Sequence, residues 1–494
     1  MSNSTMTPFA RRRRGLLGLS AMSGLWALGL AGCAVGPDFQ APDVAAPASF
    51  TREPAPAGEA PPAIAPTWWT AYQSPVIDAL VAQALARNPG IDAAEASLRA
   101  AQENVTAQRG LFYPQVQAGY GASRQNAGSV LSSPLASGDT LYTLHTAQLS
   151  VGFVADIFGG NRRQVESLQA QAASQSLQLA ALRTTLASNV VAAVIQDAML
   201  AEQIRLVEET VDVNARQVAH LRGLKAAGYS SGMDLASQEA AYAQAVALLP
   251  PLRKQRDQTR DLLATLCGRF PAEPLDATAL GAIRAPDPLP RSLPSQLVAQ
   301  RPDVQAALEQ VHAATAQVGV ATANLLPQVS LTAALGFSKD ALAGLLAADN
   351  RTWGLSAGLT QPLFAGGALR ARKRGAQAAA DAALAQYRGA VLAAFQNVAD
   401  ALYALEADGQ ALAATRQAEA ANARLLAMTQ RQFELGYTSG LALLTAKQAD
   451  LQTRAATLAA RGQYLGDTVA LYQALGGGWS PRPPTAQTTQ TTAN

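Results

Sequence analysis

The segment Tyr113-Pro114-Gln115-Val116 recurs as Leu326-Pro327-Gln328-Val329, 213 residues further along the chain (327 − 114). Each copy ends a run of helical spacing that starts at a proline, in Asn88-Pro89 and in Arg301-Pro302, and these two prolines are also 213 residues apart (302 − 89). Self-similarity at a long and nearly fixed offset indicates a tandem repeat. The repeat therefore restricts the fold more than any single residue does, and it indicates a structural conduit rather than a catalytic pocket.

The hydrophobic period changes directly after each Pro-Gln-Val segment. Apolar or aromatic residues then occupy every second position, as in Val116, Ala118 and Tyr120, which is typical of strands. The alternating runs are 116–122, 149–155, 329–337 and 353–359. They predict two strand hairpins, and each strand is close to the length that crosses a bilayer at a tilt. Four strands cannot close a barrel, and an open sheet edge is not tolerated in lipid, so several chains must close it together.

Very long helices follow both hairpins. Residues 161–227 contain no proline and a single glycine, Gly223, and at 1.5 Å per residue this run would span roughly 100 Å. A return helix then runs from Met233 past Pro250-Pro251 to Leu266. The second repeat has the same order, with helical runs over 369–435 and 441–475. Helices of this length need lateral partners along their course.

The first 32 residues have the layout of a secretory signal peptide, with four arginines, then an apolar stretch, then small residues before Cys33. Leu30-Ala31-Gly32-Cys33 resembles the bacterial lipobox, which would make Cys33 the acylated first residue of the mature chain. An ordinary signal peptide followed by a chance cysteine is the alternative. Removal of residues 1–32 leaves 34 basic residues (38 − 4) against 35 acidic ones. No charge excess suited to nucleic-acid binding remains.

These patterns predict an α+β membrane protein with the following order. The expected segments are a lipoprotein-type signal peptide at 1–32, a lipid-anchored extended arm at 33–66, repeat one at 67–270 (strand hairpin 114–158, long helices 159–267), a linker at 271–296, repeat two at 297–479 (strand hairpin 327–365, long helices 368–475) and a disordered tail at 480–494. Cys267 is expected to be a packed residue at a helix end.

Several motifs occur in an order that resembles the TolC-like outer-membrane efflux proteins, in particular their NodT-type lipoprotein branch. They are Cys33-Ala34-Val35-Gly36-Pro37-Asp38-Phe39, Trp68-Trp69, and Arg301-Pro302-Asp303-Val304 leading through Gly319 to Pro327-Gln328-Val329-Ser330-Leu331. The resemblance covers essentially the whole mature chain. It implies a homotrimer among outer-membrane lipids, with a twelve-stranded transmembrane β-barrel continued by a long α-helical periplasmic tunnel. It also implies passive conduction of small molecules from an inner-membrane pump, of the RND type, through a periplasmic adaptor, without a cofactor.

In that family the turns between the long helices form the periplasmic tip, where adaptors dock. The matching residues are Gly228, Tyr229 and Gly232 in repeat one and Gly436, Tyr437 and Gly440 in repeat two, at an offset of 208 (436 − 228). An ordinary structural interpretation is also open, in which these residues cap helices and make a turn that needs positive φ.

The sequence departs from the family at the aperture. The positions where the resemblance implies carboxylates are Ala442 and Thr445, and neither is acidic. The counterpart of Ala442 in repeat one is Asp234, so an acidic ring would use that residue. Alternatively, Asp234 favours the N-terminus of its helix by meeting the helix dipole.

Two other classes of protein are alternatives to an efflux channel. A periplasmic coiled-coil scaffold or adaptor lipoprotein would share the long helices but lack the hairpins. A secreted lipoprotein enzyme is disfavoured, because His145, His220 and His312 have no metal-ligand spacing and no nucleophile or phosphate-loop motif occurs, so we expect no catalytic or metal-binding residue. The basic cluster at Arg162-Arg163 begins a long helix. It is expected either to contact anionic lipid headgroups or form a basic tunnel ring, or to belong to a solvated or salt-bridged face.

Overall fold

The computed structural model describes residues 34–43, 50, 65–126, 128, 139–287, 289 and 296–479. The predicted signal peptide, Cys33, most of the arm between 44 and 64, and the tail at 480–494 lie outside these residues. Among the described helices, none combines the length and apolar character needed to cross a bilayer.

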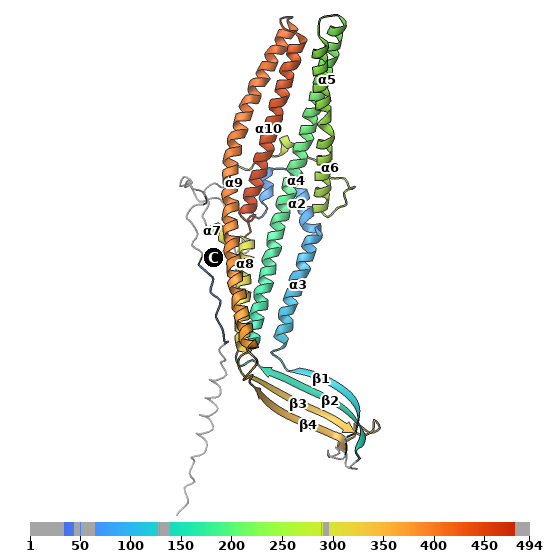
Figure 1. Cartoon of the computed structure of the whole chain (residues 1–494), viewed down its shortest axis with the longest axis vertical. Helices are drawn as coiled ribbons and strands as arrows, with labels where there is room; N and C mark the ends of the chain where they lie inside the picture. Colours follow the sequence, from blue (N-terminus) through green and yellow to red (C-terminus); the bar gives the residue numbers. More distant parts are fainter. Residues whose placement is uncertain are drawn as a thin grey trace, which may run out of the picture. The chain divides into compact units, whose positions relative to one another are not determined.

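The order of the elements repeats once along the chain (Figure 1). The first half contains η1 (Trp68–Tyr72), α2 (Pro75–Arg87), α3 (Pro89–Gly110), β1 (Gln115–Asn126), β2 (Leu141–Ala155), α4 (Gly160–Ala226), α5 (Gly232–Ala247) and α6 (Leu249–Leu266). The second half contains η2 (Leu280–Ala282), α7 (Gln296–Ala299), α8 (Pro302–Ala323), β3 (Gln328–Lys339), η3 (Ala348–Asn350), β4 (Arg351–Thr360), α9 (Ala368–Glu434) and α10 (Gly440–Ala474). Pro89 and Pro302 each begin a helix, because proline fits the first helical position, whose N–H has no intrahelical acceptor.

The two hairpins join into one antiparallel sheet in the order β1-β2-β3-β4 (Figure 1). Both β1 and β3 begin one residue after the proline of the repeated segment, Pro114 or Pro327. In the central pair, Leu149 of β2 lies opposite Leu335 of β3. Among the described residues, β1 and β4 each pair with a strand on one side only, so the sheet has two open edges. The alternation of apolar residues in the sequence correctly predicted the two strand hairpins.

The helices α4 and α9 contain 67 residues each, about 100 Å of helix at 1.5 Å per residue. The central part of α4 is buried, and Val190 and Val191 are fully covered. In contrast, α9 exposes Leu392 (72%) and Met428 (63%) in the single chain. The return path differs between the repeats, because α10 is continuous whereas α5 and α6 meet at Leu248, just before the Pro250-Pro251 pair. The helix is interrupted there because proline has no backbone N–H to donate and its ring clashes with the preceding turn of a continuous helix.

The chain divides into two compact units. The strand unit comprises the described residues within 1–41, 100–172 and 309–384, and the helical unit comprises those within 42–99, 173–308 and 385–494. In the strand unit the sheet is joined to the ends of the helices that enter and leave it. In the helical unit a continuous apolar core joins both repeats, and it includes Trp68, Tyr72, Val190, Leu263 and Leu465.

Arg301, in the Arg-Pro-Asp-Val segment, connects the start of α8 to the end of α10 inside the helical unit. Its side chain is 8% exposed and donates to the Ala474 carbonyl at 2.8 Å. It also donates to both carboxylate oxygens of Asp303, at 3.0 and 2.7 Å. A cation at the C-terminal end of a helix offsets the negative end of its dipole, so this motif has a structural role.

Cys267 is the C-cap residue of α6 and is fully buried. Burial raises the pKa of its thiol, and the charge of Arg269 opposes this rise. The prediction of a packed residue at a helix end is confirmed, and a raised pKa is unlike that of a reactive cysteine.

Candidate functional sites at the helix turns and the helix–strand junction

The turn after α4 is a Schellman motif. The Gly228 N–H donates to the Lys225 carbonyl at 3.0 Å and the Tyr229 N–H donates to the Leu224 carbonyl at 2.8 Å. Gly228 has φ of 78°, a left-handed conformation that glycine adopts without steric cost. The tyrosine side chain is left 83% exposed.

The turn after α9 has the same geometry. The Gly436 N–H donates to the Phe433 carbonyl at 3.0 Å, and the Tyr437 N–H donates to the Gln432 carbonyl at 2.8 Å. Gly436 has φ of 79° and Tyr437 is 82% exposed. The sequence repeat is thus also a repeat of backbone conformation. Both turns lie at the same end of the helical unit (Figure 1).

The other two glycines of the turns have a different role. Gly232 and Gly440 are the first residues of α5 and α10, and positive φ values occur at Gly228 and Gly436 but not at these two positions. The requirement for positive φ therefore applies to one glycine per turn.

Asp234 forms a capping box with Ser231 at the start of α5. The Asp234 N–H donates to Ser231 Oγ at 3.1 Å, while Asp234 Oδ2 accepts from the Ser231 hydroxyl at 2.7 Å and its N–H at 3.2 Å. These hydrogen bonds from Ser231 lower the pKa of the fully exposed Asp234 carboxyl. The capping geometry supports the structural interpretation of Asp234, in which it stabilises the start of α5. The carboxylate remains charged at this turn.

The equivalent turn in repeat two is capped without an acid. The Ala442 N–H donates to Ser439 Oγ at 3.2 Å, and the Thr445 hydroxyl donates to the Leu441 carbonyl within its own helix at 3.0 Å. Ala442 and Thr445 therefore bring no charge to this position. The two turns share a fold but differ by one carboxylate.

If Asp234 lines an aperture, Asp234→Asn should lower the cation-to-anion permeability ratio in planar bilayers at least about two-fold, because a ring of three carboxylates attracts cations. Ala442→Asp should raise that ratio. Ser231→Ala is the matched control, since it weakens the cap but keeps the acid. Equal selectivity in Asp234→Asn and the native channel would remove Asp234 from the aperture.

The second candidate site lies where β2 ends and α4 begins. Arg162 pairs with Asp156, with Nε to Oδ2 at 3.4 Å, and Arg163 pairs with Asp38 at 2.5 Å and with Glu166 at 2.8 Å. The salt-bridged alternative for the Arg162-Arg163 cluster is therefore correct. Arg163 is 5% exposed, so it is part of a buried contact and does not face lipid headgroups.

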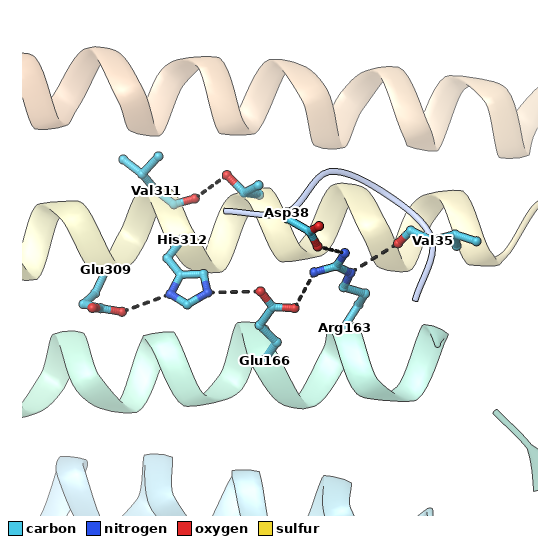
Figure 2. Close-up of polar contacts among 8 residues, drawn as sticks. Val35, Asp38, Arg163, Glu166, Glu309, Val311 and His312 are labelled. Carbon is cyan, nitrogen blue, oxygen red and sulfur yellow. Dashed lines mark hydrogen bonds and ion pairs between the residues drawn. The ribbon is translucent and has the colours of Figure 1, made fainter. Parts of the chain in front are cut away.

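Glu166 continues the polar contacts towards α8 (Figure 2). Its Oε1 lies 3.1 Å from His312 Nε2, and His312 Nδ1 lies 3.4 Å from Glu309 Oε2. The His312 ring also stacks on Phe39 of the arm, with centroids 4.4 Å apart. In the sequence, His312 was considered as a metal ligand, for which it lacks the spacing, and it was not connected to the arm. The only sequence signal for this contact was the Gly36-Pro37-Asp38-Phe39 segment.

The remaining histidines have local environments. His145 lies beside Tyr120 across the β1–β2 pair, with its Nδ1 2.8 Å from the tyrosine hydroxyl, and His220 is exposed on α4. Over the residues that the structure describes, no group of three or more His, Cys, Asp or Glu side chains is arranged to hold a metal ion.

Comparison with known proteins identifies the family. The model of the outer membrane efflux protein family matches residues 80–269 and 293–477. The chain belongs to this family. Among its relatives, the pyoverdine export outer membrane protein OpmQ of Pseudomonas putida is 31% identical over 427 residues, covering 85% of this chain and 89% of OpmQ. The toluene efflux pump outer membrane protein TtgC of Pseudomonas putida is 29% identical over 459 residues, covering 91% and 93%.

Solved structures of outer-membrane channels have the same fold. The outer-membrane channel OprN is 30% identical, with a TM-score of 0.79 over 91% of this chain and 100% of OprN. The Campylobacter jejuni channel CmeC, at 19% identity, has a TM-score of 0.81 over 91% and 96%. The predicted fold class is confirmed: the structural neighbours are trimeric TolC-like outer-membrane channels, and the four-stranded sheet and long helices of this chain are consistent with a barrel and a helical tunnel.

This outer membrane efflux protein is therefore an outer-membrane channel of an efflux system. The coiled-coil scaffold alternative does not fit, because the strand hairpins that a scaffold lacks are present. The family consists of channels, not enzymes.

Proposed function

We propose that this protein is the outlet of a tripartite efflux system, anchored by lipid on Cys33 and joined through its helix turns to a periplasmic adaptor. The adaptor would couple it to an inner-membrane pump of the RND type. The channel itself supplies a passive path, so the pump and adaptor select the small molecules that pass. The different cargoes named for the relatives, pyoverdine for OpmQ and toluene for TtgC, support a path that does not itself select.

The repeated turn is the observation that carries the adaptor proposal. Each chain presents Tyr229 and Tyr437 on hydrogen-bonded turns of the same backbone geometry, 83% and 82% exposed. Large exposed aromatic side chains on ordered backbone are characteristic of protein interfaces, where tyrosine is enriched among the residues that dominate binding. Three chains would supply six such turns, suited to a ring of adaptor molecules.

The adaptor proposal is tested with the double variant Tyr229→Ala/Tyr437→Ala, expressed in a strain that lacks the native gene. We expect resistance to the cargo to fall about ten-fold, and in-cell cross-linking to the adaptor to fall with it, while outer-membrane trimer levels stay constant. Tyr242→Ala is the control, because Tyr242 is also exposed (37%) but lies on α5 away from the turn. Native resistance and cross-linking in the double variant would contradict docking at these turns.

The lipid anchor is supported by the lipobox at Leu30-Ala31-Gly32-Cys33. Mass spectrometry of the mature N-terminal peptide should find an acylated cysteine, and Cys33→Ser should abolish that modification. An N-terminus cleaved at another bond, or an unmodified Cys33, would rule out this anchor without affecting the assignment as a channel.

A further inference from the structure

The residues that follow Cys33 lie in an ordered position against the strand unit. The Val35 N–H donates to the Phe158 carbonyl at 3.1 Å, and the Val35 carbonyl accepts from Arg163 Nε at 3.2 Å. Asp38 accepts from the same guanidinium at 2.5 Å, and Phe39 stacks on His312 with the ring planes 16° apart. The arm thus contacts both α4 and α8 (Figure 2).

The backbones approach each other closely enough to require glycine on both sides. A Cβ at Gly36 would lie 2.4 Å from the Gly319 Cα, and Gly36 also has φ of +101°. A Cβ at Gly159, between β2 and α4, would lie 2.6 Å from the Ala34 Cα. Because real Cβ atoms do not come this close to backbone atoms, these contacts form only with glycine. They make the fit specific to one register of the arm.

The guanidinium of Arg163 binds two groups of the arm, the Val35 carbonyl and the Asp38 carboxylate. It is 5% exposed, and a buried cation is stable only when its donors are satisfied. Burial acts to lower its pKa, but the hydrogen bonds and charges of Asp38 and Glu166 outweigh that effect, so the pKa is raised. Glu166, which contacts Arg163 and His312, fixes the side chain on the face that receives the arm.

The contacts do not contribute equally. The side chain of Asp38 is 85% exposed, so solvent screens its ion pair with Arg163. The ion pair alone therefore contributes little to holding the arm in place. The glycine contacts and the hydrogen bond from the Val35 N–H to the Phe158 carbonyl involve backbone atoms only, so they are insensitive to salt. Steric fit is therefore the main determinant of docking, and the ion pair adds to it.

We propose that residues 34–39 occupy an intramolecular docking site, formed by the Phe158–Gly159 turn, Arg163 and the Gly319 face of α8, which fixes the lipid anchor at the end of the barrel strands. This inference rests on the proposed acylation of Cys33. Ala34, which directly follows Cys33 in the sequence, is packed on Gly159. The acyl chains then start near the junction of β2 and α4, at the periplasmic leaflet. The first residues of the arm are therefore bound to the body of the protein and do not form a flexible linker.

The test is hydrogen–deuterium exchange on purified full-length trimers, following the peptide that contains Val35. In the native protein the Val35 amide should exchange at least about ten-fold more slowly than in an unstructured peptide. Gly36→Ala should remove most of that protection, and Asp38→Asn should reduce it about two- to five-fold. Both changes are in the arm, so neither is expected to unfold the body of the protein.

Gln40→Ala and Asp43→Asn are the matched controls in the same arm, and both should keep native protection. A native arm that exchanges as fast as an unstructured peptide would overturn the proposal, as would full protection in Gly36→Ala. Mass spectrometry of the same samples reports acylation separately. An unmodified Cys33 with a protected arm would reject the anchor but keep the docking site, whereas an acylated Cys33 with an unprotected arm would reject the docking site alone.

Discussion

Trp68→Ala is expected to lower the free energy of unfolding by about 3–5 kcal/mol, because it removes a large buried ring and leaves a cavity. Trp68 is 2% exposed and stacks on Tyr472 with centroids 5.0 Å apart. It also meets Tyr72 edge-on at 6.1 Å. The contact connects the start of repeat one to the last helix of repeat two, so its loss should loosen the helical unit. The midpoint of thermal unfolding of purified trimers should fall by roughly 5–15 °C.

The neighbouring tryptophan supplies a control for this change. Trp69 is half-buried and meets Trp68 edge-on at 6.0 Å, so Trp69→Ala should cost less than half as much. Tyr72→Phe tests the same region by another route, because it keeps the ring but removes the 2.6 Å hydrogen bond to Thr468. Equal losses in Trp68→Ala and Trp69→Ala would contradict the central role assigned to Trp68.

Asp467→Asn is expected to stabilise the protein at pH 8 and to stabilise it much less at pH 5. Burial first, and then the hydrogen bond and charge of Asp408, raise the pKa of Asp467 to about 7. Its Oδ2 is buried without a hydrogen-bond partner. A hydrogen bond between the carboxyl groups of Asp467 and Asp408 can form only when the two groups share a proton. Asp467 also lines a cavity of about 400 Å³ together with Arg301 and Asp400.

The direction of the pH effect follows from the raised pKa. Between about pH 4 and pH 7 the unfolded chain has released the proton that the folded chain keeps, so stability falls as the pH rises. Above pH 7 the folded chain holds a buried charge, at a cost of roughly 2 kcal/mol. Asp467→Asn cannot ionise and should remove this loss, and Asp408→Asn should reduce it. A difference between variant and native unfolding midpoints that is the same at pH 5 and pH 8 would contradict the shared proton.

Local patterns in the sequence were enough to predict the hairpins, the long helices and the paired turns. Strand alternation and helical spacing report which face of an element is buried, and the Gly-Tyr segments report where a helix must stop. The capping box at Ser231 and Asp234 was also within reach, because a hydroxyl residue followed three positions later by an acid is a known helix-start pattern. Sequence reasoning assigned Asp234 either to an acidic ring or to a helix-dipole effect, and it did not identify the capping box.

The contacts that sequence reasoning missed join residues far apart in the chain. Asp38 meets Arg163, and Trp68 meets Tyr472, yet nothing in the local pattern around either member specifies the other. Asp467 looks like an ordinary polar position on a helix until the packing of α9 against α10 buries it. Such partners follow from tertiary packing, which a periodic pattern constrains only by face and not by register.

The open edges of the sheet have a consequence for how the channel is made. A newly exported single chain carries unpaired N–H and C=O groups along β1 and β4, so it cannot enter the hydrocarbon core alone without leaving those groups unsatisfied. Exposed edges of this kind also pair with wrong neighbours. Insertion should therefore depend steeply on the local concentration of chains, with a rate that rises faster than linearly, and sparse expression should leave a disproportionate share of chains for periplasmic proteases.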